Sequence, residues 1–184
     1  IIGNNDKMQG LEMENFIDLN LPKNINLKIN ILGGDINLNN IQGESILETL
    51  GGDISIDNHD GRVDTKTNGG DIDLSNINGF LKGHSFGGNI YLSKSEGELS
   101  TSAVGGNIHL EEARGIIDSQ TSGGSISLLN VHATEINCKS LGGTINCDSV
   151  SGKIKIENSG KGINIQNSHG DLNIKSNSGD IFIS

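Results

Sequence analysis

The residues in this sequence that could do chemistry include a column of acidic side chains. Asp35, Asp53 and Asp71 recur at every eighteenth position, and Asn89 and Asn107 continue the series. Carboxylates stacked on adjacent strands would repel one another and could bind a hard cation. The alternative is a solvated edge at which each Asp accepts hydrogen bonds from backbone N–H groups. We favour the solvated edge, because the spacing assembles no cage of six oxygen ligands.

The calcium-binding β-roll is a second candidate for cation chemistry. Its repeat, G-G-x-G-x-D, places Asp and backbone ligands from successive turns around a calcium ion. Here the fourth position of each unit is Ile, as at Ile36, and the sixth is never Asp. We therefore expect no calcium site of this type, and no metal or cofactor.

Two cysteines fall in expected inward positions of the repeat described below. Cys138 and Cys147 fit two small buried hydrophobic side chains, with a disulfide across the core as the alternative. Neither belongs to a C-x-x-C motif or lies near a His at zinc-ligand spacing.

No G-x-S-x-G, H-E-x-x-H, P-loop or G-x-G-x-x-G arrangement is present. We predict no catalytic residues and no enzyme; carbohydrate-cleaving β-helices are the alternative, but these uniform units leave no loop to build a cleft.

Four ring side chains are conspicuous because aromatic residues make up only 3% of the chain. They fall at outward or corner positions of adjacent units, and they are Phe80, Phe86, Tyr91 and His109. The corner position of Phe86 is also apolar in other units, at Leu50, Val104 and Leu141. An exposed apolar strip can mark a partner site. We take the four rings as a candidate partner surface; the alternative is that the N-terminal segment or a missing domain covers them.

A repeat has to position all of these residues. Gly-Gly pairs begin at every eighteenth position from Gly33 to Gly123, and the next pair begins one position late, at Gly142, which predicts one inserted residue near 133–135. Each unit continues with Ile, a mostly polar residue, and Leu, Ile or Cys, which is the alternation of a half-buried strand. A second Gly, as at Gly43, marks a corner, and the Asn-rich column before it, as at Asn40, tolerates a left-handed backbone. A second alternating strand follows.

A unit of this length cannot bury its own apolar face, so identical units must stack. We predict an all-β, single-domain parallel β-solenoid (β-helix) with eighteen-residue coils and a right-handed winding. Residues 1–32 are expected to form a degenerate N-terminal capping coil. Residues 33–184 are expected to form eight full coils and the start of a ninth.

Charge and hydropathy exclude other classes of protein. The chain has 184 residues, with 13 Lys and Arg against 23 Asp and Glu, a formal net charge of −10. Such an acidic chain lacks the basic face of a nucleic-acid binder. No apolar run is long enough for a membrane span. The chain begins at Ile1 rather than Met, so we expect a fragment or processed form whose upstream signal or anchor lies outside it.

The unit G-G-[DN]-I-x-[LI]-x-x-[IV]-x-G, as in residues 33–43 and 69–79, resembles a bacterial putative-adhesin domain family of unknown function, related to the auto-transporter adhesin head GIN domain. The lead-in at residues 21–28, followed by residues 32–36, is also similar to that family. The resemblance covers about residues 16–184. It implies a β-helical, envelope-associated or secreted bacterial protein and brings no catalytic residues.

We expect a non-catalytic structural or adhesive module at a bacterial cell envelope, acting by contact with a protein or glycan. Self-association end to end or edge to edge is a further expectation. The alternative is a membrane-anchored or intracellular regulatory domain that binds a protein. A signal peptide or anchor upstream of Ile1 would discriminate between the two.

Overall fold

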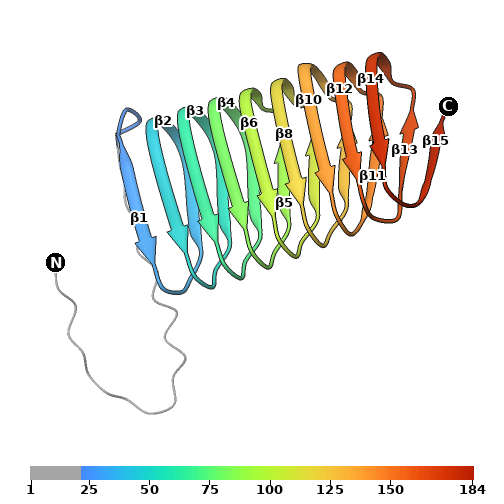
Figure 1. Cartoon of the computed structure of the whole chain (residues 1–184). Coiled ribbons are helices and arrows are strands. Elements are labelled where there is room, and N and C mark those ends of the chain that lie inside the picture. The colour runs from blue at the N-terminus through green and yellow to red at the C-terminus, as the bar shows by residue number, and fades with distance from the viewer. Residues whose placement is uncertain (1–21) are drawn as a thin grey trace.

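Residues 22–184 are described by the computed structural model, and they wind into about nine stacked coils, about 18 residues apart (Figure 1). Every strand pairing is parallel, and the described residues contain no helix. The strands are β1 (Leu27–Ile31), β2 (Ile36–Thr49), β3 (Ile54–Thr67), β4 (Ile72–Ser85), β5 (Ile90–Ser93), β6 (Glu96–Ala103), β7 (Ile108–Glu111), β8 (Arg114–Thr121), β9 (Ile126–Leu129), β10 (His132–Ser140), β11 (Thr144–Asp148), β12 (Ser151–Asn158), β13 (Gly162–Gln166), β14 (His169–Ser176) and β15 (Asp180–Ile183). The predicted all-β parallel β-solenoid is confirmed, and its right-handed winding stays a prediction.

Two walls of strands enclose the core. The first wall begins in the first halves of β2, β3 and β4 and continues through β5, β7, β9, β11, β13 and β15. The second wall begins with β1 and the second halves of β2, β3 and β4, and continues through β6, β8, β10, β12 and β14. Equivalent residues of successive coils are direct partners, as for Ile72, Ile90 and Ile108. Each residue type in the repeat therefore forms a column along the solenoid.

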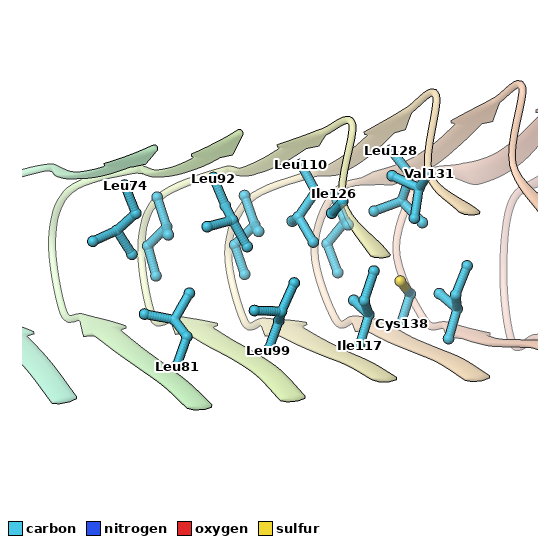
Figure 2. Packing of buried hydrophobic residues seen from close by; sticks show 14 of the residues in the cluster. Leu74, Leu81, Leu92, Leu99, Leu110, Ile117, Ile126, Leu128, Val131 and Cys138 are labelled. Carbon is cyan, nitrogen blue, oxygen red and sulfur yellow. The ribbon is translucent and has the colours of Figure 1, made fainter. Parts of the chain in front are cut away.

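The core is a ladder of aliphatic side chains between these walls (Figure 2). The Ile column of the first wall is almost fully buried: Ile54, Ile72, Ile90, Ile108, Ile126, Ile145 and Ile163. Opposite it, Leu81, Leu99 and Ile117 of the second wall are equally buried. Because each apolar side chain packs against its copies above and below, burial is shared along the whole stack.

The predicted backbone corners are confirmed. Asn40, Asn58, Asn76, Asn130 and Asn167 all have φ between 50° and 59°, in the left-handed region where Asn is tolerated. The same corner is left-handed in the three units without Asn, at Lys94, Glu112 and Ser149. The predicted inserted residue is confirmed as well, since the pairing of β10 with β8 shifts register between Ala133 and Glu135.

The units differ in one way that the repeat did not predict. In β2, β3 and β4 a single strand of 14 residues continues through the corner, whereas later coils have a short strand followed by a longer one. The change begins at Ser95, whose hydroxyl accepts a hydrogen bond from the N–H of Ile77 at 3.1 Å and donates to the carbonyl of Ser93 at 2.8 Å. The Ser95 side chain thus replaces a backbone hydrogen bond between neighbouring strands at this corner.

The expected capping coil falls partly on residues 1–21, which lie outside the described residues. Within the described part, β1 pairs with β2 in the register of the other coils, Leu27 opposite Ser45. The division of the chain into a capping coil and a solenoid at residue 32 stays a prediction.

Candidate functional site

The acidic column forms a hydrogen-bond ladder along the Gly-Gly edge. Asp35 Oδ1 accepts the N–H of Asp53 at 2.8 Å, and Asp53 Oδ1 accepts the N–H of Asp71 at 2.7 Å. The ladder continues through Asn89 and Asn107 in the same geometry. One oxygen of each acid is thereby committed to a backbone group, as the favoured interpretation predicts. Within residues 22–184, no three His, Cys, Asp or Glu side chains are grouped so that they could hold a metal ion.

The two cysteines are free thiols in the core, on facing walls. Cys138 lies on β10 and Cys147 on β11, and both are buried. Burial raises the pKa of the Cys147 thiol to about 12 and raises that of Cys138 well above its ordinary value. Because the thiolate is the reactive form, these thiols are unreactive and serve as packing groups in the core. The structure has no disulfide between Cys138 and Cys147, so the alternative of a disulfide across the core is wrong.

His59 is a polar side chain in a mostly apolar column. It lies between Ile41 and Ile77 on adjacent coils and is 1% exposed. Its Nε2 is 2.8 Å from the hydroxyl oxygen of Ser45, while its buried Nδ1 has no hydrogen-bond partner. Burial lowers the pKa of His59, and nearby Asp60 opposes this only in part. The imidazole is therefore held neutral.

We expect the buried His59 to make the solenoid less stable in acid. Because its pKa is lower when folded than when unfolded, the unfolded chain binds more protons below the ordinary His pKa of about 6.5. Stability is then full above that pH and falls as the pH drops toward the folded pKa. His59→Ile, which matches its column neighbours, should remove this loss. The measurement is the free energy of unfolding by urea at pH 8, 7, 6 and 5 for both proteins.

His84→Gln is the control for this experiment, because the pKa of His84 is also lowered by burial but its ring is not in the core column. That variant should keep most of the acid loss. The same slope of stability against pH in wild type and His59→Ile would contradict the assignment to His59.

Tyr91 and His109 form the first part of the candidate surface. They face outward from β5 and β7 on the first wall and are direct neighbours in register. Their ring centroids are 6.5 Å apart, and Tyr91 is 43% exposed. His109 Nε2 also lies 4.0 Å from a carboxylate oxygen of Glu111. The two rings form a short aromatic row on a mostly polar wall.

Phe80 and Phe86 form the second part, near β4. Phe80 lies in the second half of β4, on the second wall, with the guanidinium carbon of Arg62 4.1 Å above its ring centre. Phe86 follows β4 at the Gly-Gly corner and is 46% exposed, with its ring edge-to-face against His84 at 4.7 Å. The four predicted residues therefore do not form one cluster, because Phe80 and Tyr91 lie on opposite walls and Phe86 lies at the corner between them.

The apolar corner extends further than the aromatic residues. Leu32, Leu50, Val104 and Leu141 are exposed at the same corner as Phe86, in other coils. Sequence reasoning misses Leu32 because it precedes the first Gly-Gly pair of the clean repeat. The corner before each Gly-Gly pair thus has an interrupted apolar ridge along the solenoid.

A surface depression beside the left-handed corner gathers charged residues of both signs. Its volume is about 490 Å³, and Lys94, Glu96, Glu112, Arg114 and His132 line it. Register places Glu96 opposite Arg114 on adjacent strands. The regular spacing of the repeat does not predict this depression, because the depression is formed by corner residues that differ from unit to unit.

Residues 22–184 contain no helix with the length and apolar character to cross a bilayer.

Comparison with known proteins identifies the family. No curated protein and no solved structure matches the chain. A family model described as Toastrack DUF4097, a domain of unknown function, matches residues 88–184. The match covers more than half of the 184 residues and begins within the Gly-Gly pair that precedes β5. The chain therefore belongs to the Toastrack DUF4097 family.

Proposed function

We propose that this chain is a non-catalytic module that works by surface contact, displayed at a bacterial cell envelope, where it binds a protein or a glycan. The observation that carries the proposal is the aromatic row of Tyr91 and His109 on a mostly polar wall. Exposed aromatic rings are the side chains that most often concentrate binding energy. Phe86 at the adjacent corner adds a second exposed ring.

The chemistry of the first wall supports a polar, ring-shaped ligand such as a glycan. The outward neighbours of Tyr91 are Asp73 and His109 along its column, so one ring is flanked by a carboxylate and an imidazole. An aromatic face can cover the C–H face of a sugar, while flanking polar groups bind its hydroxyls. A protein surface with one exposed apolar side chain would suit the same row.

The proposal of no catalysis is supported by the distribution of polar groups. The two thiols are buried and protonated, and the one strongly buried imidazole among the described residues, that of His59, faces the core. The envelope location and the adhesive role are supported by the resemblance of the G-G-D-I units to putative-adhesin domains, as at residues 33–43. Both remain parts of the proposal.

We expect the double substitution Phe86→Ser and Tyr91→Ser to weaken binding about tenfold or more while leaving the fold intact. A tenfold change corresponds to about 1.4 kcal/mol. Truncating two central aromatic contacts typically costs more than that. Neither ring is in the core, so the melting temperature should hardly move. The measurement is binding of the labelled chain to an array of bacterial surface glycans and to intact bacterial cells.

Ile116→Ser is the matched control, because Ile116 is an equally exposed apolar side chain on the second wall, outside the aromatic row. It should bind like wild type. Unchanged binding by the double variant would move the contact surface elsewhere. Binding to an intracellular protein but to no glycan or cell would favour the regulatory alternative.

A further inference from the structure

The surface depression beside the left-handed corner lies where the repeat departs from its own pattern. Most units carry Asn at this corner, whereas two consecutive units carry Lys94 and Glu112. Both line the depression, which has a volume of about 490 Å³, and so do Glu96 and Arg114, each two residues further along its coil. These four charged side chains are exposed. The residues that break the Asn column therefore help to build the depression.

Lys94 and Glu112 carry a conformational cost that Asn largely avoids. Their φ angles are 49° and 53°, in the left-handed region, where most residues are disfavoured because Cβ crowds the following carbonyl oxygen. Asn is tolerated there because its short polar side chain can form hydrogen bonds near the corner, as Asn58 does by donating to Asn40 Oδ1. Backbone strain of this kind clusters at functional sites. The two replacements therefore point to a role for this depression other than stability.

The charges in the depression alternate in sign but do not form ion pairs with one another. Register places Glu96 beside Arg114 on adjacent strands, just as it places Glu44 beside Arg62. The second pair is an ion pair, with Arg62 Nε 3.4 Å from Glu44 Oε1. Within residues 22–184, by contrast, none of the four charged side chains of the depression takes part in an ion pair within 4.0 Å. Charges of both signs are thus available to a ligand.

The arrangement of these charges selects the class of ligand. Glu112 follows Lys94 by one coil and Arg114 follows Glu96 by one coil, so opposite signs alternate both along and across the coils. A simple anion or cation would meet a repelling charge beside every attractive one. A ligand with both charges can place each group against its opposite. We propose that the depression binds a zwitterion with an ammonium and a carboxylate group, as an amino acid or a short peptide has.

Each charged side chain has a defined role in this complex. The guanidinium of Arg114 binds the carboxylate, because its planar fork can donate two parallel hydrogen bonds to the two carboxylate oxygens. Lys94 adds a second positive charge on the same side of the recognition. Glu96 and Glu112 accept hydrogen bonds from the ammonium group. Because hydrogen bonds between charged groups are stronger than neutral ones, removal of either charge from the ligand should be costly.

The test is a titration of the whole, nitrogen-15-labelled chain with free glycine and with triglycine, followed by NMR. Backbone amides of residues 93–97 and 111–115 should shift at millimolar concentrations of a zwitterionic probe, the affinity range of a small ligand with few contacts. The N-acetylated and C-terminally amidated forms of the same probe each lack one charge and should bind about tenfold more weakly or less. Shifts with free glycine identify a single amino acid as sufficient, and shifts with triglycine alone identify a peptide. No shift with either probe, or equal binding by a form that lacks one charge, would overturn the proposal.

Substitutions at the corner separate binding from stability. Lys94→Asn and Glu112→Asn restore the residue that the left-handed corner prefers, so each should raise the melting temperature and yet weaken binding of the zwitterionic probe. Ser149→Asn is the matched control, because Ser149 has φ 56° at the same corner and does not line the depression. It should also raise the melting temperature, and it should bind the probe like wild type. Wild-type binding by both Lys94→Asn and Glu112→Asn would overturn the proposal.

This site is tested separately from the proposed function. The variant with Phe86→Ser and Tyr91→Ser keeps all four charged side chains of the depression, so it should bind the zwitterionic probe like wild type. Arg114→Gln should lose that binding by about tenfold or more and keep the binding to glycans or cells that the aromatic row provides. Either binding activity can therefore fail while the other remains.

Discussion

Replacing Ile108 by Asp is expected to unfold the solenoid. Ile108 is 1% exposed on β7, between Ile90 and Ile126 of the neighbouring coils. A carboxylate there has no cation or hydrogen-bond donor of its own, and burying an unpaired charge costs several kcal/mol or more. That cost is comparable with the whole stability of an ordinary domain, about 5–15 kcal/mol. The variant should be insoluble or show no cooperative thermal unfolding by circular dichroism.

Ser127→Asp is the matched control, because Ser127 lies on the adjacent strand β9 with its side chain directed outward. The same charge at this position meets solvent, and the melting temperature should change little. A soluble Ile108→Asp protein that melts at the wild-type temperature would contradict the register of the core columns.

The architecture could be predicted because the repeat encodes it at every position. Alternation of Ile108 with His109 determines which side chains face the core, and the regular Gly-Gly spacing determines which residues stack. Even the inserted residue near Ala133 followed from one change in spacing. Each of these features depends on residues a few positions apart or one coil apart, and both distances can be counted in the sequence.

Contacts that depend on the shape of the coil could not be predicted from spacing in the sequence. The small residues at the ends of the second-wall strands suggest a taper, but most of them, unlike Ala103, are hydrogen-bonding groups. Thr67 donates its hydroxyl to the carbonyl of Gly52 at 2.9 Å and accepts the N–H of Gly70 at 3.1 Å. The hydroxyl thus joins two successive Gly-Gly corners, which lie one full coil apart in the sequence and adjacent in space.

The candidate surface was predicted only in part for a related reason. Alternation distinguishes inward from outward residues, and it correctly gave Phe86 and Tyr91 as exposed. It does not say on which wall an outward residue lies, because that depends on the angles at the two corners between the strands. Phe80 and Tyr91 therefore appeared to be neighbours and lie on opposite walls. Nothing in a periodic core specifies a ligand, so function has to be argued from residues that break the repeat.

The second Gly of a Gly-Gly pair inside the stack is expected to be hard to replace, and Gly106 is the position to test. Its backbone is not in the left-handed region, so conformational freedom is not the reason. A Cβ built on Gly106 would overlap the carbonyl oxygen of Gly88 in the coil before. That oxygen belongs to the main chain, so the overlap can be relieved only by moving the coils apart. We expect Gly106→Ala to lower the free energy of unfolding by about 3 kcal/mol or more, measured by urea denaturation.

Gly105→Ala makes the comparison specific, because it adds the same methyl group one residue earlier. A Cβ there would meet the carbonyl oxygen of Phe86 at 3.3 Å, a tight contact that a shift of a few tenths of an ångström relieves. Gly105→Ala should therefore cost clearly less than Gly106→Ala. Equal losses would mean that general backbone stiffening, rather than close approach of the coils, explains the glycines. A larger loss at Gly106 would explain why Gly stands there in unit after unit, since stacked corners leave no room for a side chain.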